Sequence, residues 1–106
     1  MAQFDVHRNL GASRARYPFL IVVQSGLLRR WERRVVVPLA VAAPFPGAPD
    51  PQLNPIVEVD GMRLYIAAQE ITNVPVGALG EVVDNLRDRS EMVIKAIDWM
   101  LSQGFG

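Results

Sequence analysis

The chain has 106 residues, which is enough for one domain with a modest core and too few for two. Half of the residues are apolar and 21% are charged, a balance typical of a globular protein rather than a disordered one. Eleven basic residues balance eleven acidic ones, which argues against a broad nucleic-acid surface and leaves room only for a local basic patch.

The sequence contains no cysteine and a single histidine, His7, so it disfavours a zinc site, a thiol nucleophile and a disulfide framework. The N-terminus has neither the basic start nor the apolar run of a signal peptide. No stretch approaches the roughly 20 apolar residues that a membrane span needs. We therefore expect a soluble cytoplasmic protein with no metal and no cofactor.

Two short runs in the first half are rich in valine, isoleucine and aromatic residues. They are "YPFLIVVQ", residues 17–24, and "RRVVVPLA", residues 33–40. Near-continuous apolarity over such short runs predicts strands that are covered on both faces. Pro38 cannot donate to a strand ladder, so the second strand should lie at a sheet edge or bend at that position.

A proline-rich segment and a hairpin follow. Residues 42–55 carry five of the eight prolines and predict a surface loop. Residues 55–68 contain two strand-like runs joined by Asp60 and Gly61, a pair typical of a type I′ turn. Residues 73–81 are punctuated by proline and glycine and predict an irregular crossing.

From Arg87 onward the apolar residues recur with the period of a helix, over about 16 residues or roughly 24 Å. Asp88 or Ser90 is the expected N-cap, and Gly104 the expected stop. The apolar face of this helix consists of Val93, Ala96, Ile97, Met100 and Leu101.

Four arginines, Arg29, Arg30, Arg33 and Arg34, bracket Trp31. Arginines on phosphates with a tryptophan stacked on a base would make a nucleic-acid contact. The alternative is a solvated turn between two strands with an aromatic lid. We favour the turn, because the net charge of the chain is zero.

Catalytic candidates are few. His7 lies near Asp5 and Arg8 and could act as a general base, but no serine or cysteine partner is recognisable by its spacing, so we expect a surface histidine. Glu81 and Asp84 are expected on the polar face of a short turn. The segment "GALGE" lacks the lysine and the serine or threonine of a phosphate-binding loop. These patterns predict a binding protein with no catalytic residues.

An ordered set of fragments runs along nearly the whole chain. The fragments are "QF" near the start, "VQSGLL", "RRVVVPLA", "LNPIVEVDG", "ITNVPVGALGEVVDNL" and "IKAIDWM". In their order and approximate spacing they resemble the CcdB family of plasmid-maintenance toxins. The resemblance implies one domain over residues 1–106: a mainly β, SH3-like barrel shared with MazF, with a small additional sheet and one C-terminal α-helix.

The resemblance also implies a function and partners. Members of this family are homodimers with adjacent C-termini that bind the A subunit of DNA gyrase and stabilise its cleaved complex with DNA. A cognate, CcdA-like antitoxin removes them. Such a toxin makes and breaks no bond itself, and it is expected to contact nucleic acid only within the toxin–antitoxin complex that autoregulates its transcription.

Site residues are carried over position by position. The resemblance assigns gyrase contacts to Leu27, Leu28, Asp98, Leu101, Ser102, Gln103, Gly104 and Phe105. It assigns the dimer interface to Ile97, Met100 and Leu101.

The closing Phe-Trp-Gly-Ile signature of the family is altered here. Leu101 takes the phenylalanine position, and Ser102 or Gln103 stands where tryptophan is expected. Gly104 matches the glycine. Phe105 replaces the final isoleucine and would be an apolar anchor worth roughly 1.5 to 3 kcal/mol if fully buried.

Two alternatives remain open at this stage. One is a MazF-type endoribonuclease on the same barrel, with the arginines of residues 29–34 as its substrate contact. The other is a degenerate, non-toxic homologue that only binds an antitoxin.

Overall fold

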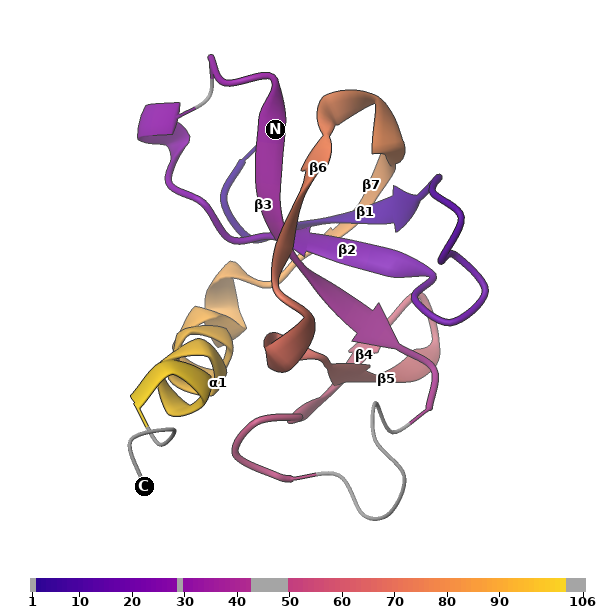
Figure 1. The fold of residues 1–106 in the computed structure, drawn as a ribbon. Helices are drawn as coiled ribbons and strands as arrows, with labels where there is room; N and C mark the ends of the chain where they lie inside the picture. Colours follow the sequence, from indigo (N-terminus) through magenta and orange to yellow (C-terminus); the bar gives the residue numbers. More distant parts are fainter. Residues whose placement is uncertain (1, 29, 43–49, 103–106) are drawn as a thin grey trace.

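The computed structural model describes residues 2–28, 30–42 and 50–102. In this part of the chain seven strands form one curled sheet, and a single α-helix packs against one side of it (Figure 1). The strands are β1 (Asp5–Asn9), β2 (Phe19–Val22), β3 (Arg33–Ala40), β4 (Ile56–Val59), β5 (Met62–Ile66), β6 (Thr72–Pro75) and β7 (Leu79–Asn85). The helix is α1 (Ser90–Ser102), and the 3-10 turns are η1 (Gly26–Leu28), η2 (Ala68–Glu70), η3 (Val76–Ala78) and η4 (Arg87–Arg89).

The strand order is β4-β5-β3-β2-β1-β7, and β6 pairs with the first half of β3. All pairs are antiparallel. The curled sheet forms a half-closed barrel, in agreement with the mainly β, SH3-like barrel that the family resemblance predicts. The predicted small additional sheet does not form separately among the described residues: β6 joins the same sheet by pairing with β3.

Strand β3 is central to the sheet and carries β2 along one side. On its other side it pairs with β6 as far as Val36 and with β5 from Leu39 onward. Pro38 falls between these two partners, and Figure 1 shows that β3 changes direction along its length. An edge position for this strand is therefore wrong, and the bend is what accommodates the proline.

The predicted hairpin is confirmed. Strands β4 and β5 pair from Ile56 opposite Tyr65 to Val59 opposite Met62. Asp60 has a φ of 53° and Gly61 a φ of 75°, so both central residues adopt the left-handed conformation of a type I′ turn.

Strands β1 and β7 were not predicted. They pair with each other through two irregularities around His7, and Glu81 and Asp84 lie within β7, so their placement in a short turn is wrong. His7 is only 3% exposed, so its expected surface position is also wrong. Both strands mix polar and apolar residues without strict alternation, which leaves no period for a sequence pattern to detect.

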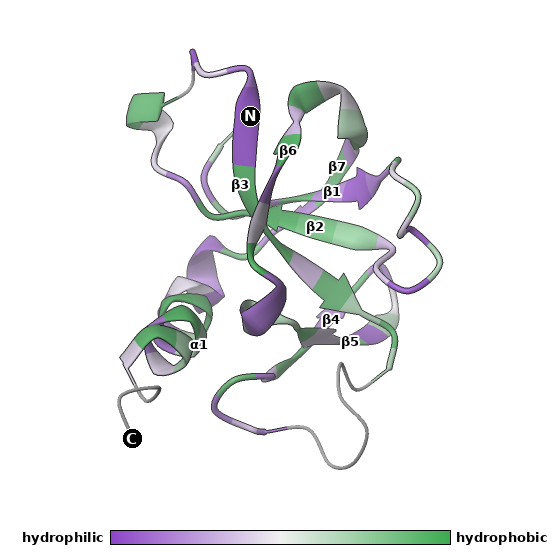
Figure 2. Cartoon of the chain, in the orientation of Figure 1, coloured by the Kyte–Doolittle hydropathy of each residue, from purple (hydrophilic) through white to green (hydrophobic). Residues whose placement is uncertain are grey.

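Two clusters of apolar side chains fill the two faces of the curl. The larger lies beneath α1 and includes Phe19, Ile21 and Leu39, while the smaller includes Leu20 and Val22 on the other face of β2. Figure 2 shows mostly apolar colouring along β2 and the second half of β3, whereas the start of β3 is polar. Strand β2 is covered on both faces, as its composition predicts.

The helix follows the predicted period but is shorter, with 13 residues preceded by η4. Val93 and Ala96 are its fully buried residues. Among the described residues, no hydrogen bond from the side chain of Asp88 or Ser90 caps the helix. The side-chain oxygen of Asn85 accepts the backbone N–H of Arg87 at 2.8 Å in the turn that precedes α1. The expected stop at position 104 lies outside the described residues.

Candidate functional site

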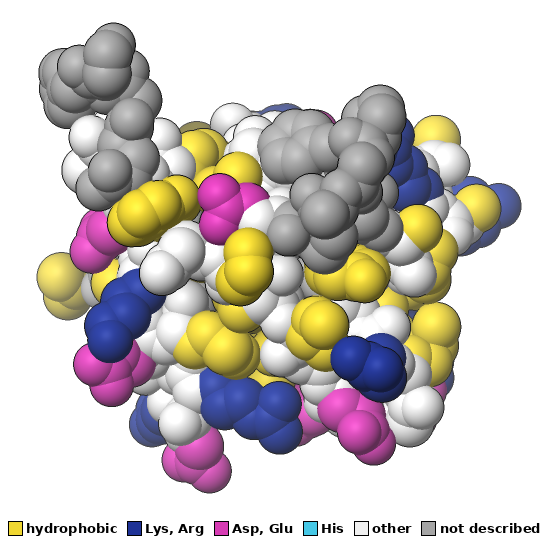
Figure 3. All heavy atoms as spheres, turned by 90° about the horizontal axis from the view of Figure 1, so that it is seen from below, with side chains coloured by type: hydrophobic (Ala, Val, Ile, Leu, Met, Phe, Trp, Pro, Cys, Tyr) yellow, Lys and Arg dark blue, Asp and Glu magenta, His cyan; other side chains and the backbone are white. Residues whose placement is uncertain are grey.

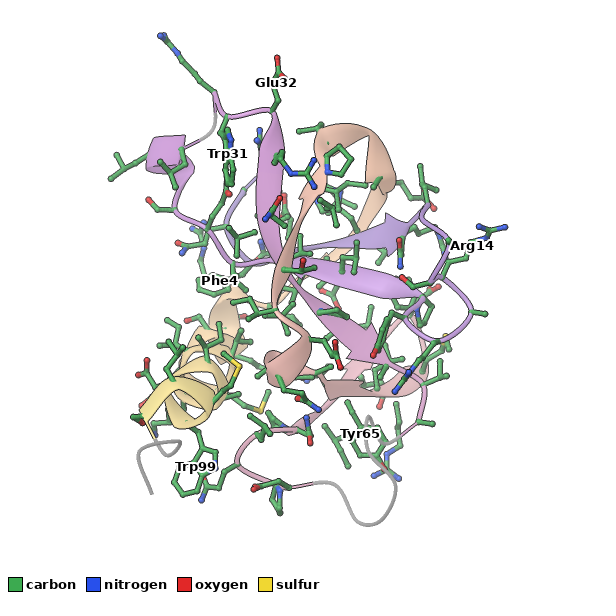
Figure 4. The ribbon with its side chains drawn as sticks, in the orientation of Figure 1. Phe4, Arg14, Trp31, Glu32, Tyr65 and Trp99 are labelled. Atoms are coloured by element: carbon green, nitrogen blue, oxygen red, sulfur yellow. The ribbon has the colours of Figure 1, made fainter. Side chains whose placement is uncertain are left out.

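An exposed apolar surface surrounds η1, between β2 and β3. Leu27 is 91% exposed, Leu28 51% and Trp31 45%. These three side chains and Arg30 line a hollow of about 400 Å³, and we call this set the η1 surface. In Figure 4 the indole of Trp31 stands between η1 and β3. Three large apolar side chains are thus exposed within five residues and form a continuous patch. Such patches are typical of interaction sites, whereas single exposed apolar residues are common on any surface.

The local backbone explains why the leucines point outward. The Ser25 hydroxyl oxygen accepts the N–H of Leu27 at 3.2 Å, and its carbonyl accepts the N–H of Leu28 at 3.1 Å. The carbonyl of Leu28 then accepts the N–H of Trp31 at 3.0 Å. The segment is thus wound into consecutive tight turns that stand away from the sheet, with no core beneath them.

A buried glutamine holds one end of this segment. Gln24 is 9% exposed, and its side-chain oxygen accepts the N–H of Val35 on β3 at 2.9 Å. Its side-chain nitrogen donates to the carbonyl of Leu28 at 3.5 Å. Gln24 therefore joins η1 to the start of β3.

A buried arginine holds the other end. Arg34 is 8% exposed, and its guanidinium donates to the carbonyl of Trp31 and, at 2.8 Å, to that of Arg33. The guanidinium of Arg33 donates to the side-chain and backbone oxygens of Asn73 on β6. The expectation of a fully solvated arginine turn is therefore wrong for Arg34, which is a structural part of the loop.

The η1 surface carries the positive charge of Arg30, and Arg33 lies nearby on β3. Arg30 is exposed and has no hydrogen-bond or ion-pair partner among the described residues, while Arg33 pairs with a neutral amide. Glu32 is the one acidic residue between positions 24 and 35 of the sequence. In Figure 4 its side chain points away from Trp31 into solvent. Arg29 lies outside the described residues.

The second group of predicted contacts is at the end of α1. Asp98, Leu101 and Ser102 are exposed there, Leu101 by 64%. The Ser102 hydroxyl donates to the carbonyl of Asp98 at 2.6 Å and is thus engaged within the helix. Gln103, Gly104 and Phe105 lie outside the described residues.

The three predicted dimer residues differ in their burial. Ile97 is half-buried and packs against the larger core cluster of its own chain. Met100 is half-buried, and Leu101 is exposed. Of these three, Leu101 therefore exposes the most apolar surface to a second subunit.

Leu27 and Leu28 do not meet the described members of the second group, Asp98, Leu101 and Ser102, within one chain. In Figure 1, η1 is the short turn at the upper left and α1 lies at the bottom, and Figure 4 shows Trp31 and Trp99 correspondingly far apart. The face seen from below, in Figure 3, intersperses charges of both signs with apolar side chains and has no patch of a single sign.

The acidic and histidine candidates have structural partners. Arg8 donates to Glu81 at 2.7 Å and to Asp60 at 3.3 Å, and these bonds raise the pKa of its guanidinium, the one to Glu81 most. The network ties β1 to β7 and to the hairpin. Nδ1 of His7 lies 2.9 Å from the carbonyl of Gly80 and must carry the proton, because that oxygen only accepts. Its Nε2 is buried with no partner among the described residues.

A further hollow of about 380 Å³ lies between the β1–β2 turn and β6. Leu20, Pro38 and Val74 form apolar parts of its wall, and Tyr17 and Glu70 are among its polar residues. Sequence reasoning gave no sign of it, because its walls come from segments that are distant along the chain. Within residues 2–28, 30–42 and 50–102 no group of three or more metal-ligating side chains is assembled.

Comparison with known proteins identifies a matching family and several solved structures of similar fold. The family model described as CcdB protein matches residues 3–104. An endoribonuclease of a mycobacterial species, solved with its cognate antitoxin, is 14% identical with a TM-score of 0.73, over 100% of this chain and 97% of its own. A second mycobacterial endoribonuclease is 16% identical with a TM-score of 0.70, over 95% of this chain and 90% of its own.

The Mycobacterium tuberculosis toxin MazF-mt6 is 15% identical with a TM-score of 0.69, over 92% of this chain and 95% of its own. At these identities the likeness shows a common fold. No helix in the described part of this chain has the length and apolarity to cross a membrane.

Proposed function

This chain belongs to the CcdB family of toxins, and on that basis we propose that it is the toxin of a type II toxin–antitoxin system, which binds the A subunit of DNA gyrase and traps the gyrase–DNA cleavage complex. A cognate antitoxin neutralises it, and it acts in the cytoplasm without catalysing a reaction. The observation that carries the proposal is the exposure of Leu27 and Leu28, the two residues that the family resemblance assigns to gyrase contact.

A homodimer is part of this proposal. The η1 surface and the end of α1 are separate on one chain, so a partner that contacts both must either span the molecule or meet them on two subunits (Figure 1). Pairing through Met100 and Leu101 would cover the apolar surface that the last helical turn exposes. Sedimentation of the purified protein with Leu101 intact and replaced by aspartate tests this step.

The gyrase assay is the direct test of function. Purified protein at micromolar concentration, added to the cognate gyrase with DNA and ATP, should accumulate a cleaved complex. The double variant Leu27→Asp, Leu28→Asp should lose this effect, since two charges replace the apolar contact. Leu10→Asp is the matched control, because Leu10 is 58% exposed but lies outside the η1 surface. Unchanged cleavage and supercoiling with the intact protein would refute gyrase poisoning.

An endoribonuclease is the second candidate, supported by the fold shared with mycobacterial endoribonucleases. The arginine cluster gives it less support than the sequence alone, because Arg33 and Arg34 are engaged with protein carbonyl oxygens and Asn73. Incubation with single-stranded RNA decides the matter. Defined cuts that disappear in Arg30→Ala would favour this candidate over gyrase poisoning.

A non-toxic homologue that only binds antitoxin predicts a different result in cells. Expression of the chain alone would then leave growth unchanged. A gyrase poison should arrest growth, and co-expression of its antitoxin should restore it.

A further inference from the structure

We propose that Trp31 is the residue that determines which gyrase surface this toxin recognises: the hollow beside its indole receives an apolar side chain of the A subunit, and Arg30 pairs with a carboxylate next to that side chain. This inference rests on the proposed function and adds to it the chemistry of the partner. Family resemblance assigns gyrase contacts to the two leucines and to the end of the chain, and gives Trp31 no role.

The first argument is the shape and composition of the hollow. Among the described residues its walls are Leu27, Leu28 and Trp31, with Arg30 as the one charged residue. Its volume of about 400 Å³ is at the lower end of ligand-sized cavities, which suits one or two protein side chains better than an extended surface. Tryptophan and arginine are also the residue types that most often dominate the binding energy of protein interfaces.

The second argument is that the surface is held in place before binding. The carbonyl of Leu28 is bound by Gln24 and that of Trp31 by Arg34, and both anchoring side chains are at least nine-tenths buried. Trp31 also donates its backbone N–H to Leu28. A loop anchored at both ends loses little conformational freedom on binding, so the exposed indole is a preorganised contact.

The third argument is charge. Arg30 lacks an ion-pair partner among the described residues, and Arg33 bonds to the neutral side chain of Asn73. Arg34 is buried and does not contribute to this surface, and Glu32 points away from Trp31 (Figure 4). The positive charge of Arg30 beside the apolar hollow complements an acidic segment that presents an apolar residue, and it disfavours a basic one.

The test is the affinity of the intact toxin for the gyrase A subunit, measured by calorimetry at two salt concentrations. Trp31→Ala should bind at least about 30-fold more weakly, the effect of removing an interface hot spot. Trp31→Phe should retain much of the affinity, since a smaller aromatic still fills part of the hollow. Arg30→Ala should weaken binding and flatten its salt dependence, while Arg30→Lys keeps both close to the wild type.

Leu10→Ala is the matched control, because it removes an exposed apolar side chain elsewhere. A second readout uses Trp99→Phe, which leaves Trp31 as the only tryptophan of the toxin. Acrylamide quenching of this variant's fluorescence should fall when a tryptophan-free A-subunit fragment binds.

The outcomes separate the two proposals. If the intact toxin binds gyrase but Trp31→Ala binds within two-fold of it, the inference about Trp31 is wrong and the proposed function stands. If Trp31 remains open to acrylamide in a bound complex, the inference is again wrong. If the intact toxin does not bind the A subunit, the proposed function itself is overturned.

Discussion

The two ends of strand β3 are surrounded differently. Its last five residues are all buried, between the larger core cluster on one face and the smaller on the other. Its first residues are polar, pair with the short strand β6, and support the exposed η1 surface. One strand thus carries the packing that stabilises the fold and the platform that presents three large apolar side chains to solvent. Changes in the first region should act on stability, and changes in the second on binding.

The largest effect is expected in the core region. Phe19→Ala removes a side chain that is 1% exposed and lies opposite Leu39, and it leaves a cavity in the larger core cluster. The free energy of unfolding should fall by about 3 to 5 kcal/mol. Urea titration followed by circular dichroism measures this. A loss below about 1 kcal/mol would show that the packing of this region does not dominate stability.

A smaller effect is expected where the two regions meet. Arg34→Ala leaves the carbonyls of Trp31 and Arg33 without this donor and should lower the free energy of unfolding by about 1 to 3 kcal/mol. It should also weaken gyrase binding, although Arg34 itself is not exposed, because the loop loses its anchor. Urea titration and calorimetry give the two values, and in the urea titration Arg30→Ala is the control for the loss of one positive charge. Unchanged affinity would mean that the η1 surface needs no anchor.

The platform region should show the reverse pattern. Leu27→Ser changes a side chain that is 91% exposed, so the free energy of unfolding should stay within about 0.5 kcal/mol of the wild type. Cleavage-complex trapping should nevertheless decrease. A loss of stability comparable with that of Phe19→Ala would break the division between the two regions.

The smallest effect concerns acid stability at the start of β1. Burial alone would raise the pKa of Asp5, but hydrogen bonds from the Ala2 backbone and the Asn85 side chain, with the nearby His7 and N-terminal charges, leave it below its ordinary value of 3.8. Because the pKa is lower in the folded state, the ionised Asp5 carboxylate stabilises the fold. This stabilisation is complete above the ordinary pKa and is lost as the pH falls through the folded pKa.

Asp5→Asn should therefore be slightly less stable than the wild type at neutral pH, and the difference should shrink as the pH falls below about 4. Thermal unfolding across that range tests it. Asp84→Asn, at an exposed position on the neighbouring strand β7, is the comparison variant. A difference that persists unchanged to the lowest pH would exclude the carboxylate as its source.

The parts of the fold with a strong local signal were predicted correctly. The β3 run, the Asp60–Gly61 turn and the helix each follow from composition, turn chemistry or period within a few neighbouring residues. Strands β1 and β7 were missed, because their polar residues are accommodated by partners distant in sequence. His7, for instance, is buried through a bond to the carbonyl of Gly80.

For the candidate site, Leu27 and Leu28 came from a resemblance, and the structure shows their exposure. Gln24 and Arg34 were missed, since a glutamine ending a strand and an arginine in a basic run carry no sign of what they bind. Their partners are main-chain groups, which every residue possesses, so no residue pattern identifies them.

By itself, the sequence determined the chemistry available to this protein: one mainly β domain, no thiol, a single histidine, and an apolar pair followed by arginines and a tryptophan. Tertiary structure alone decided which of these groups are accessible. Two arginines of one cluster are engaged as supports, a third is left exposed, and the histidine is buried in the sheet. The physical reason is that exposure and pairing depend on neighbours brought together by the curl of the sheet, whereas turn chemistry and helical period depend only on neighbours along the chain.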